Sequence, residues 1–186
     1  MTMDQDSGPR ILQLEQQLAK LVAKDEIREC LYRINRGMDR IDRPLMLSGF
    51  HDDAQICWAA PDYVRLDQFI EIAMRMQATT SRTQHLIGTV LIDLDGESAN
   101  VESYELGRHL TPMPDGEKDL FIAARYIDRF SCRNGKWRIE RRLKLIDSIR
   151  VVEGHDTKYD GVPHKGLRSR DDQSYALFGA ATFGAE

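Results

Sequence analysis

The sequence predicts an α+β domain in which helices come first and a mostly antiparallel sheet follows. Apolar residues recur every three or four positions over the first third of the chain, which is the period of a helix. Residues 84–149 are instead rich in β-branched and aliphatic side chains, which favour strands. The pairs Asp95-Gly96 and Asn134-Gly135 divide that region and are strong signals for hairpin turns. This order of elements is typical of the α+β class.

Two helices and a short third one are expected in the N-terminal region. Four residues form an apolar stripe on the first helix, namely Ile11, Leu14, Leu18 and Leu21. Asp25 is a candidate N-cap for the second helix, which ends in a charged run that contains Gly37. Asp39 is therefore expected near a helix terminus. Asp42 and Pro44 predict the start of the short third helix.

The rest of the domain is expected to be strands around one further helix. The expected strands cover residues 54–58, 84–94, 99–110, 120–132 and 136–149, and the helix covers residues 66–78. Long strands linked by hairpins predict a curled sheet that wraps the N-terminal helices as a cone-shaped barrel and encloses a pocket. The outer face of this sheet carries apolar residues that a monomer would expose, which predicts a homodimer or homotrimer formed through the sheet.

The chain has the size and composition of one globular domain, with 186 residues, 41% hydrophobic and 30% charged. We expect a mobile N-terminus over residues 1–9, a domain over residues 10–150, and a C-terminal arm or lid over residues 151–186. A net charge of −4 argues against a sequence-independent grip on nucleic acid. No apolar run is long enough to span a membrane. The three cysteines are far apart and fit free thiols in a reducing cytosol, so a cytoplasmic location is expected.

Asp39 and His85 are the candidate catalytic residues. His85 opens the first long strand, and an aspartate that orients an imidazole creates a general base able to work near neutral pH. Without that contact, the two are a solvated carboxylate at a helix end and a histidine at a strand edge. Residues 51–53 have the side chains of a metal site, but no second cluster has suitable spacing, so no metal is expected. The other histidines, His109 among them, are expected to be solvated.

Several segments together resemble the SnoaL-like branch of the nuclear transport factor 2-like superfamily. They are Leu31 to Asp42, Phe50 to Ala54, Thr83 to Gly88, and Tyr126 to Arg129 followed by Gly135 to Ile139 and Arg142. The resemblance covers roughly residues 10 to 150 and implies a small cone-shaped α+β barrel. This is the same class of fold that the helical and strand periodicities predict.

Within that branch, the chain resembles hexachlorocyclohexane dehydrochlorinase, bile-acid dehydratase and scytalone dehydratase. The resemblance implies that Asp39 and His85 match a catalytic pair that removes a proton and expels a leaving group without a cofactor. It also implies that Arg142 matches a pocket arginine that stabilises developing negative charge. Strand alternation instead places Arg141 on the apolar face, and Arg142 needs a bulge to point inward. Ile34 stands where the bile-acid enzyme has a tyrosine, so no side-chain acid for the leaving group is identified there.

The resemblance implies lyase or isomerase chemistry on a hydrophobic small molecule, as in a dehydratase, a dehydrohalogenase or a ketosteroid-isomerase-like enzyme. Six residues are expected to line the substrate pocket: Tyr32, Phe69, Met74, Leu91, Tyr104 and Tyr126. The alternative is a non-catalytic protein, either the small (β) subunit of an aromatic-ring-hydroxylating dioxygenase or a small-molecule-binding module. Arg141 to Asp147 resembles the final strand of those subunits.

Overall fold

The computed structural model describes residues 7–58, 61–154 and 161–178 of the chain. The helices are α1 (Ser7–Arg40), α2 (Arg43–Leu47), α3 (Leu66–Thr79) and α4 (Ser174–Leu177). The strands are β1 (Phe50–Cys57), β2 (Val64–Arg65), β3 (Arg82–Asp95), β4 (Ser98–Met113), β5 (Gly116–Arg133) and β6 (Lys136–Glu153). Helices followed by an antiparallel meander confirm the predicted α+β class.

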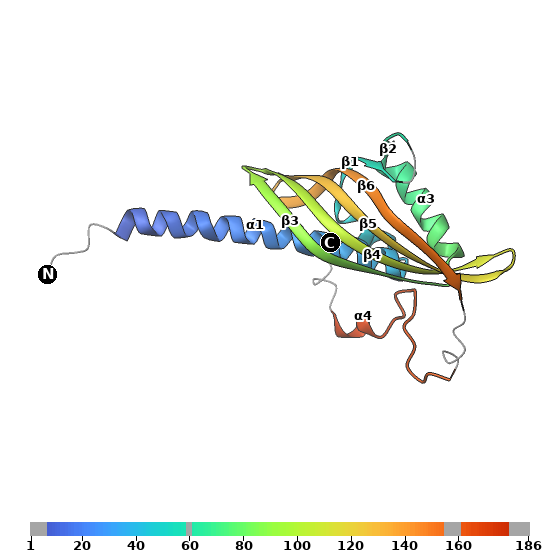
Figure 1. Ribbon diagram of the computed structural model, residues 1–186. Coiled ribbons are helices and arrows are strands. Elements are labelled where there is room, and N and C mark those ends of the chain that lie inside the picture. Colours follow the sequence, from blue (N-terminus) through green and yellow to red (C-terminus); the bar gives the residue numbers. More distant parts are fainter. Residues whose placement is uncertain (1–6, 59–60, 155–160, 179–186) are drawn as a thin grey trace.

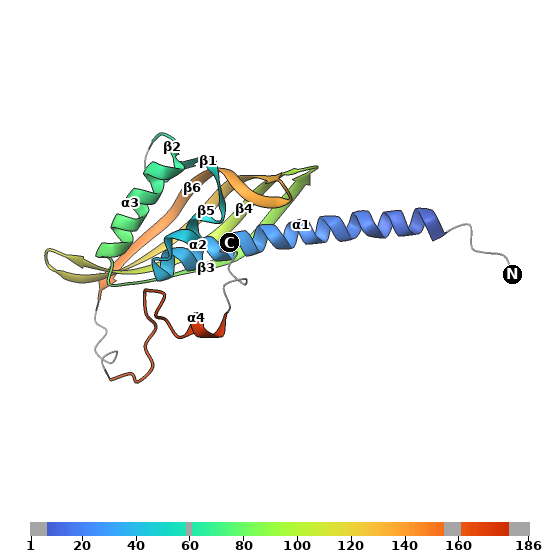
Figure 2. The ribbon, with the colours of Figure 1, turned by 180° about the vertical axis from the view of Figure 1, so that it is seen from behind.

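The strands form one curled sheet that does not close into a full barrel (Figure 1). Their order is β2-β1-β6-β5-β4-β3, so the four long strands lie side by side in sequence order and β1 joins them next to β6. Only β1 and β6 are parallel among the strand pairs of the described residues. Helices α1 and α3 lie on the same side of the sheet (Figure 2). The predicted curled sheet around N-terminal helices is confirmed.

The hydrophobic core fills the space between these helices and the inner face of the sheet. Its largest buried members include Ile27, Leu31 and Ile34 of α1, Ile70 of α3, and Phe50, Phe130 and Ile139 of the strands. Burial of a large apolar side chain contributes roughly 1.5–3 kcal/mol. This packing holds the second half of α1 against the sheet, and it brings the end of that helix next to β3.

Helix α1 is a single helix of 34 residues, so the expectation of two helices with a cap at Asp25 is wrong. Residues 11–34 contain no glycine or proline that would interrupt the helical hydrogen bonds. The first half of the helix extends beyond the sheet (Figures 1 and 2). The stripe from Ile11 to Leu21 is therefore exposed and does not join the core. The helix begins at Ser7, within the segment expected to be mobile, and residues 1–6 lie outside the described part.

The end of α1 is determined by the close approach of α2. A Cβ on Gly37 would lie 2.6 Å from the backbone nitrogen of Met46, which leaves room for glycine alone. Ile41 has a positive φ of 52°, which ends the helix, and Asp42 then caps α2 through its side chain. Asp39 therefore lies in the last turn of α1, near a helix terminus as the sequence predicts.

An irregularity in β6 decides which arginine faces the core. The pairing of β5 with β6 slips by one residue, which leaves Glu140 as a bulge. Beyond the bulge, Arg142 points inward and its side chain is 3% exposed. Arg141 points outward, with its guanidinium 4.0 Å from the centroid of the Tyr63 ring. The choice between the two arginines is settled in favour of Arg142 as the inward one.

The C-terminal segment, described over residues 161–178, packs against the ends of α1 and α3. Arg168 donates hydrogen bonds to the C-terminal end of α3. Arg170 and the Tyr175 hydroxyl both donate to Oδ2 of Asp42, at 2.9 Å and 2.8 Å. These contacts bring Arg168 to the site described below. In the described part of the chain, no helix is long and apolar enough to cross a membrane.

Candidate active site

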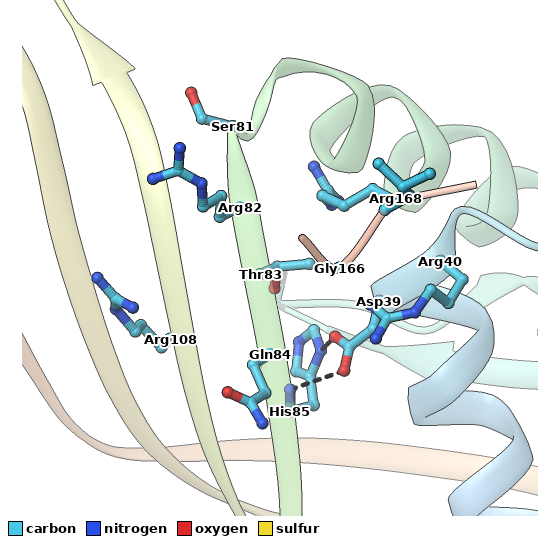
Figure 3. A pocket seen from close by; sticks show the side chains of 11 residues that line it. Asp39, Arg40, Ser81, Arg82, Thr83, Gln84, His85, Arg108, Gly166 and Arg168 are labelled. Carbon is cyan, nitrogen blue, oxygen red and sulfur yellow. Dashed lines mark hydrogen bonds and ion pairs between the residues drawn. The ribbon is translucent and has the colours of Figure 1, made fainter. Parts of the chain in front are cut away.

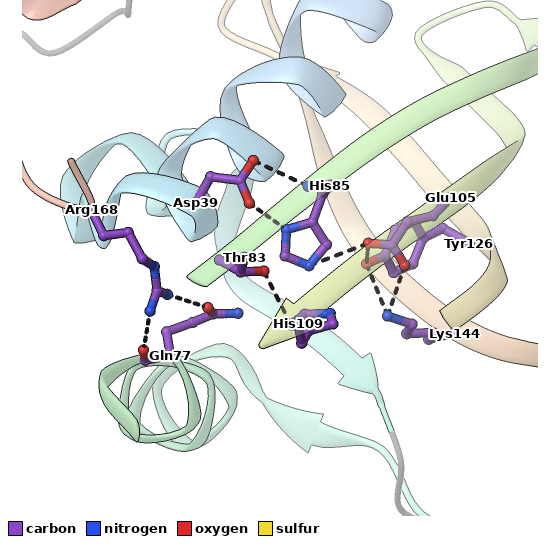
Figure 4. A network of polar contacts seen from close by, with 9 residues as sticks. All are labelled: Asp39, Gln77, Thr83, His85, Glu105, His109, Tyr126, Lys144 and Arg168. Carbon is purple, nitrogen blue, oxygen red and sulfur yellow. Dashed lines mark hydrogen bonds and ion pairs between the residues drawn. The ribbon is translucent and has the colours of Figure 1, made fainter. Parts of the chain in front are cut away.

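Asp39 and His85 contact each other directly (Figure 4). Oδ1 of Asp39 lies 2.6 Å from Nδ1 of His85, and the backbone N–H of His85 donates to Oδ2 at 3.1 Å. The helix end thus holds both the ring and the backbone of the strand residue. Because the carboxylate takes the hydrogen bond from Nδ1, Nε2 is the nitrogen that keeps a basic lone pair. The pair has the geometry of an oriented general base, in which the imidazole is 3% exposed.

Three more polar side chains continue the network on the other side of the imidazole. Nε2 of His85 lies 3.7 Å from Oε1 of Glu105 on β4. Glu105 is paired with Lys144 at 2.8 Å and accepts a hydrogen bond from the Tyr126 hydroxyl at 2.8 Å. Burial alone would raise the pKa of Glu105, but the charges of Lys144 and His85 outweigh it and hold this pKa below its ordinary value. Glu105 is thus an anion beside Nε2, where it favours the imidazolium that forms when His85 takes a proton.

His109 is a largely enclosed neighbour of the pair, so the expectation that it is solvated is wrong. Its Nδ1 lies 3.1 Å from the Thr83 hydroxyl, and its ring centroid lies 5.0 Å from that of His85. Gly107 leaves space for both rings, because a Cβ there would lie 3.0 Å from Nε2 of His109. Burial, helped by the charges of His85 and Lys144, lowers the pKa of His109 to about 4. His109 is therefore a neutral hydrogen-bonding group at neutral pH.

The low pKa of His109 predicts a loss of stability in mild acid. The unfolded chain binds a proton at this histidine below pH 6.5, whereas the folded chain binds it only near pH 4. Unfolding is therefore increasingly favoured as the pH falls through this window, by about 2 kcal/mol at pH 5 for this group. Urea unfolding at pH 7.5 and pH 5 should show a smaller loss for His109→Gln than for the wild type. An equal loss in the two proteins would contradict the prediction.

Arg142 lies on the inner face but is paired with Asp128. Its Nε and Nη2 donate to the two carboxylate oxygens of Asp128 at 2.8 Å and 2.7 Å, and both side chains are buried. The guanidinium also lies 3.9 Å from the centroid of the Tyr126 ring. Neither of the pockets that touch Asp39 and His85 includes Arg142. The structure therefore shows Arg142 bracing the inner face, and its role in stabilising charge on a substrate stays a proposal.

Two pockets touch the Asp39–His85 pair. The larger, of about 630 Å³, is lined by Asp39, Arg40, Ser81, Arg82, Thr83, Gln84, His85, Arg108, Gly166, Leu167 and Arg168. The side chains of Arg82 and Arg108 lie on one side of β3, and Asp39 with the His85 ring lies on the other (Figure 3). This pocket is therefore a groove over the edge of the strand. The smaller, of about 370 Å³, is lined by Tyr32, Asn35, Arg36, Asp39, Arg40, His85, Leu86 and Ile87. The C-terminal segment forms part of the wall of the larger pocket.

The residues expected to line the substrate pocket are not brought together. Tyr32 lines the smaller pocket. Phe69 is buried in the core, Met74 packs against the core, and Tyr126 is buried beside Glu105. These three residues do not line either pocket that touches the pair.

Leu91 and Tyr104 lie on the outer face of the sheet, so the expectation that they line the pocket is wrong. Their exposed fractions are 55% and 46%. Side chains alternate along a strand, and Tyr104 lies between Ser103 and Glu105, which both face inward and are buried. A register shift in β3 just before Val90 leaves Leu91 pointing outward in the same way.

An apolar surface that the sequence did not identify lies on the same sheet face as His85. His85 pairs with Gly107, which pairs with Ile122, which pairs with Ile149. Residues directly opposite in neighbouring strands share a face, so this row runs across the inner face away from the imidazole. The flanking rows add Ile146 and Val151, and Ile146, Ile149 and Val151 are 45%, 54% and 55% exposed. An apolar ligand can rest on this surface.

Glu105 and Lys144 were not predicted from the sequence as site residues. A usable signal existed for Glu105, because alternation along β4 places it on the same face as the apolar Val101 and as His109. A charged residue at an inward position of a strand requires a partner. No comparable signal existed for Lys144, because its face depends on the bulge at Glu140.

His51 is buried and Asp53 is exposed, and each contacts a residue of β5. Nε2 of His51 lies 3.0 Å from the backbone oxygen of Ser131, and Asp53 accepts a hydrogen bond from Arg133 at 2.8 Å. Among the residues that the structure describes, no group of three or more His, Cys, Asp or Glu side chains is placed to hold a metal ion.

Proteins of known structure share this fold at low sequence identity. A type 3 hexachlorocyclohexane dehydrochlorinase, LinA, from Novosphingobium barchaimii has a TM-score of 0.67 and 15% identity over 75% of this chain and 96% of its own. A scytalone dehydratase-like protein from Novosphingobium aromaticivorans has a TM-score of 0.64 and 18% identity, over 73% and 91%. An aromatic ring hydroxylase-like protein from the same species has a TM-score of 0.63 and 16% identity, over 71% and 94%. At these identities the likeness shows the fold alone.

The family of the chain is shown by its sequence. No curated protein matches it. The model of the SnoaL-like domain family matches residues 19–143, which is more than half of the chain. The matched region starts within α1 and ends within β6, so it contains Asp39, His85 and Glu105. The chain belongs to the SnoaL-like domain family.

Proposed function

We propose that the protein is a cofactor-independent lyase or isomerase that acts on a hydrophobic small molecule through Asp39 and His85. The observation that carries the proposal is the 2.6 Å contact between Oδ1 of Asp39 and Nδ1 of His85. Membership of the SnoaL-like family supports the proposal. The structural neighbours, which include a dehydrochlorinase and a scytalone dehydratase-like protein, also support it.

In the proposed reaction, Nε2 of His85 takes a proton from a carbon beside a carbonyl or a leaving group. The electron pair of that C–H bond forms the new double bond or enolate, and a leaving group departs with its own electron pair. Asp39 keeps the imidazole in the tautomer with a free Nε2, and Glu105 stabilises the imidazolium from the other side. In an isomerase, His85 returns the proton to a different carbon.

The substrate would rest on the apolar inner surface that contains Ile146, Ile149 and Val151. This surface lies in the direction of Nε2, whereas the larger pocket is lined mainly by polar side chains. The imidazole is only 3% exposed, so neighbouring groups must move for a carbon to reach it. We propose that the C-terminal arm, whose Arg168 forms part of the pocket wall, acts as the lid that moves.

The proposal is tested by proton exchange in D₂O, followed by NMR, with a panel of cyclic ketones, β-hydroxy ketones and halogenated cyclohexanes. The wild-type protein is expected to exchange or eliminate at the activated C–H bond of at least one probe. Binding of probes with neither exchange nor elimination would favour the alternative of a small-molecule-binding module. Stable association with a larger iron–sulfur subunit would favour the small subunit of a dioxygenase.

Glu105→Gln is expected to lower kcat in this assay by about 10-fold, which corresponds to ~1.4 kcal/mol of transition-state stabilisation. The amide keeps the shape and the acceptor for Tyr126 but removes the charge that favours the imidazolium. The matched control is Glu102→Gln, on the same strand but facing outward against Arg125. Equal kcat values for the two variants would contradict the role of Glu105, and the pH profile of kcat should shift only for Glu105→Gln.

The outer face of the sheet supports the proposal of a homodimer or homotrimer. Its exposed apolar side chains include Leu86, Leu91, Tyr104, Leu106 and Phe121. Covering such a surface with a second copy removes apolar area from water and so lowers the free energy. Light scattering at micromolar concentration is expected to show a multiple of 21.4 kDa, and a mass of one chain would contradict the proposal.

A further inference from the structure

The N-terminal half of α1 carries an apolar stripe that the described part of the chain leaves uncovered. Ile11, Leu14, Leu18 and Leu21 are 54%, 56%, 61% and 65% exposed. The helix extends beyond the sheet at this end, and its first residue in the buried core is Ile27 (Figures 1 and 2). In proteins most helical stability comes from packing an apolar face. We therefore expect a partner to cover the exposed stripe.

The stripe has the spacing of a coiled-coil seam. Counted in heptads, Ile11 and Leu18 occupy a positions, and Leu14 and Leu21 occupy d positions. The first heptad, with the β-branched Ile11 at a and Leu14 at d, favours two parallel strands, while the second has leucine at both positions. The next a position is Asp25, which would bring two carboxylates together, so the seam ends there. The partner that fits such a seam is a helix with the same heptads.

Charged residues beside the stripe select a parallel second copy of this chain. Arg10 and Lys24 occupy g positions, and Glu15 and Glu29 occupy e positions. In a parallel pair each g residue faces the e residue of the next heptad, so Arg10 meets Glu15 of the partner within the seam. Glu29, the residue that would face Lys24, lies beyond the end of the seam at Asp25. In an antiparallel pair, g residues face one another, and Arg10 would meet Lys24. Opposite charges meet in the first arrangement and like charges in the second.

We propose that residues 7–24 form a parallel two-stranded coiled coil with the same segment of a second copy. The segment is about 27 Å long at 1.5 Å per residue, and most of it precedes the family match at residue 19. This contact is separate from the outer face of the sheet and from the Asp39–His85 pair. It gives the chain a second self-association surface, which begins beyond the sheet and ends where Leu21 and Lys24 line a pocket with Ile92 and Leu94 of β3.

Disulfide crosslinking in the 186-residue chain tests the proposal. In a parallel pair an a residue faces its own copy, so Leu18→Cys is expected to form a disulfide-linked dimer under mild oxidation at micromolar concentration. The matched control is Gln16→Cys, at the f position on the opposite side of the same helix. We expect Leu18→Cys to crosslink roughly 10-fold faster than Gln16→Cys, because the seam raises the effective thiol concentration. The wild-type chain measures the background from its own cysteines, of which Cys132 is partly exposed while Cys30 and Cys57 are buried.

Equal crosslinking rates for Leu18→Cys and Gln16→Cys would overturn the proposal. In the Leu18→Cys background, Arg10→Glu is expected to slow crosslinking, and adding Glu15→Arg is expected to restore it. Faster crosslinking with Arg10→Glu would overturn the parallel arrangement, because that change relieves repulsion only in an antiparallel pair. All these positions are exposed, so the thermal unfolding of the domain should be unchanged. The readout depends on neither turnover nor the sheet interface.

Discussion

Asp39→Asn and His85→Ala are each expected to lower turnover by about 10³- to 10⁴-fold while the fold stays intact. Asparagine keeps the shape of Asp39 but loses its charge, and its single acceptor oxygen cannot accept from both Nδ1 and the backbone N–H of His85, so the Nδ1–H tautomer is no longer selected. Alanine at residue 85 removes the proton acceptor itself. The two residues act as one unit, so their effects should not add. Turnover by the double variant should lie within a few fold of turnover by the slower single variant.

The measurement is kcat/KM for the best probe of the exchange panel, with circular dichroism as the check on folding. Asp93→Asn, which makes the same chemical change at the other end of β3, is the matched control and should retain wild-type turnover. The Nδ1–H proton signal of His85 should also be lost from the downfield region of the NMR spectrum in Asp39→Asn. Wild-type turnover by His85→Ala would contradict the proposed mechanism and would indicate a pocket that works by binding alone.

Arg142→Met is expected to destabilise the fold by about 3–5 kcal/mol. The substitution leaves the Asp128 carboxylate buried without the two hydrogen bonds, at 2.8 Å and 2.7 Å, that compensate for its desolvation. Methionine is close to arginine in length, so the loss comes mainly from the uncompensated charge. Urea unfolding followed by circular dichroism gives the free energy of unfolding of each variant.

The double variant Asp128→Leu with Arg142→Met separates the ion pair from the packing. Removing both charges is expected to recover most of the stability, because no buried charge is left unpaired. A loss below 1 kcal/mol for Arg142→Met alone would show that the pair does not support the inner face. A large loss of turnover in the stable double variant would instead support the proposed role of Arg142 in stabilising charge on the substrate.

Local patterns in the sequence determine the class of fold, because hairpins and helices depend mainly on neighbouring residues. Asn134 and Gly135 have φ of 54° and 72°, the positive values that a tight hairpin turn requires and that this residue pair favours. Asp39 and His85 were identified from a helix end, a strand start and a family resemblance. Their contact itself depends on the core that packs α1 against β3.

Helical periodicity shows that a helix has an apolar face, but it does not show what covers that face. The stripe from Ile11 to Leu21 and the stripe from Ile27 to Met38 have similar spacings. The sheet is long enough to cover only the second stripe, so the first is exposed. This difference is a property of the tertiary structure, since it depends on where the sheet ends.

The face of the strand residues that follow a bulge was decided by the tertiary structure alone. The side-chain period of a strand is two, so one bulged residue reverses the facing of the residues after it until a second shift occurs, as it does in β6 between Ile146 and Ser148. The bulge at Glu140 places Arg142 and Lys144 inside, and the shift in β3 places Leu91 outside. A bulge depends on the register with the neighbouring strand, which local sequence does not contain. Glu105 gains its partners in the same way, because they arrive from other strands only when the sheet has formed.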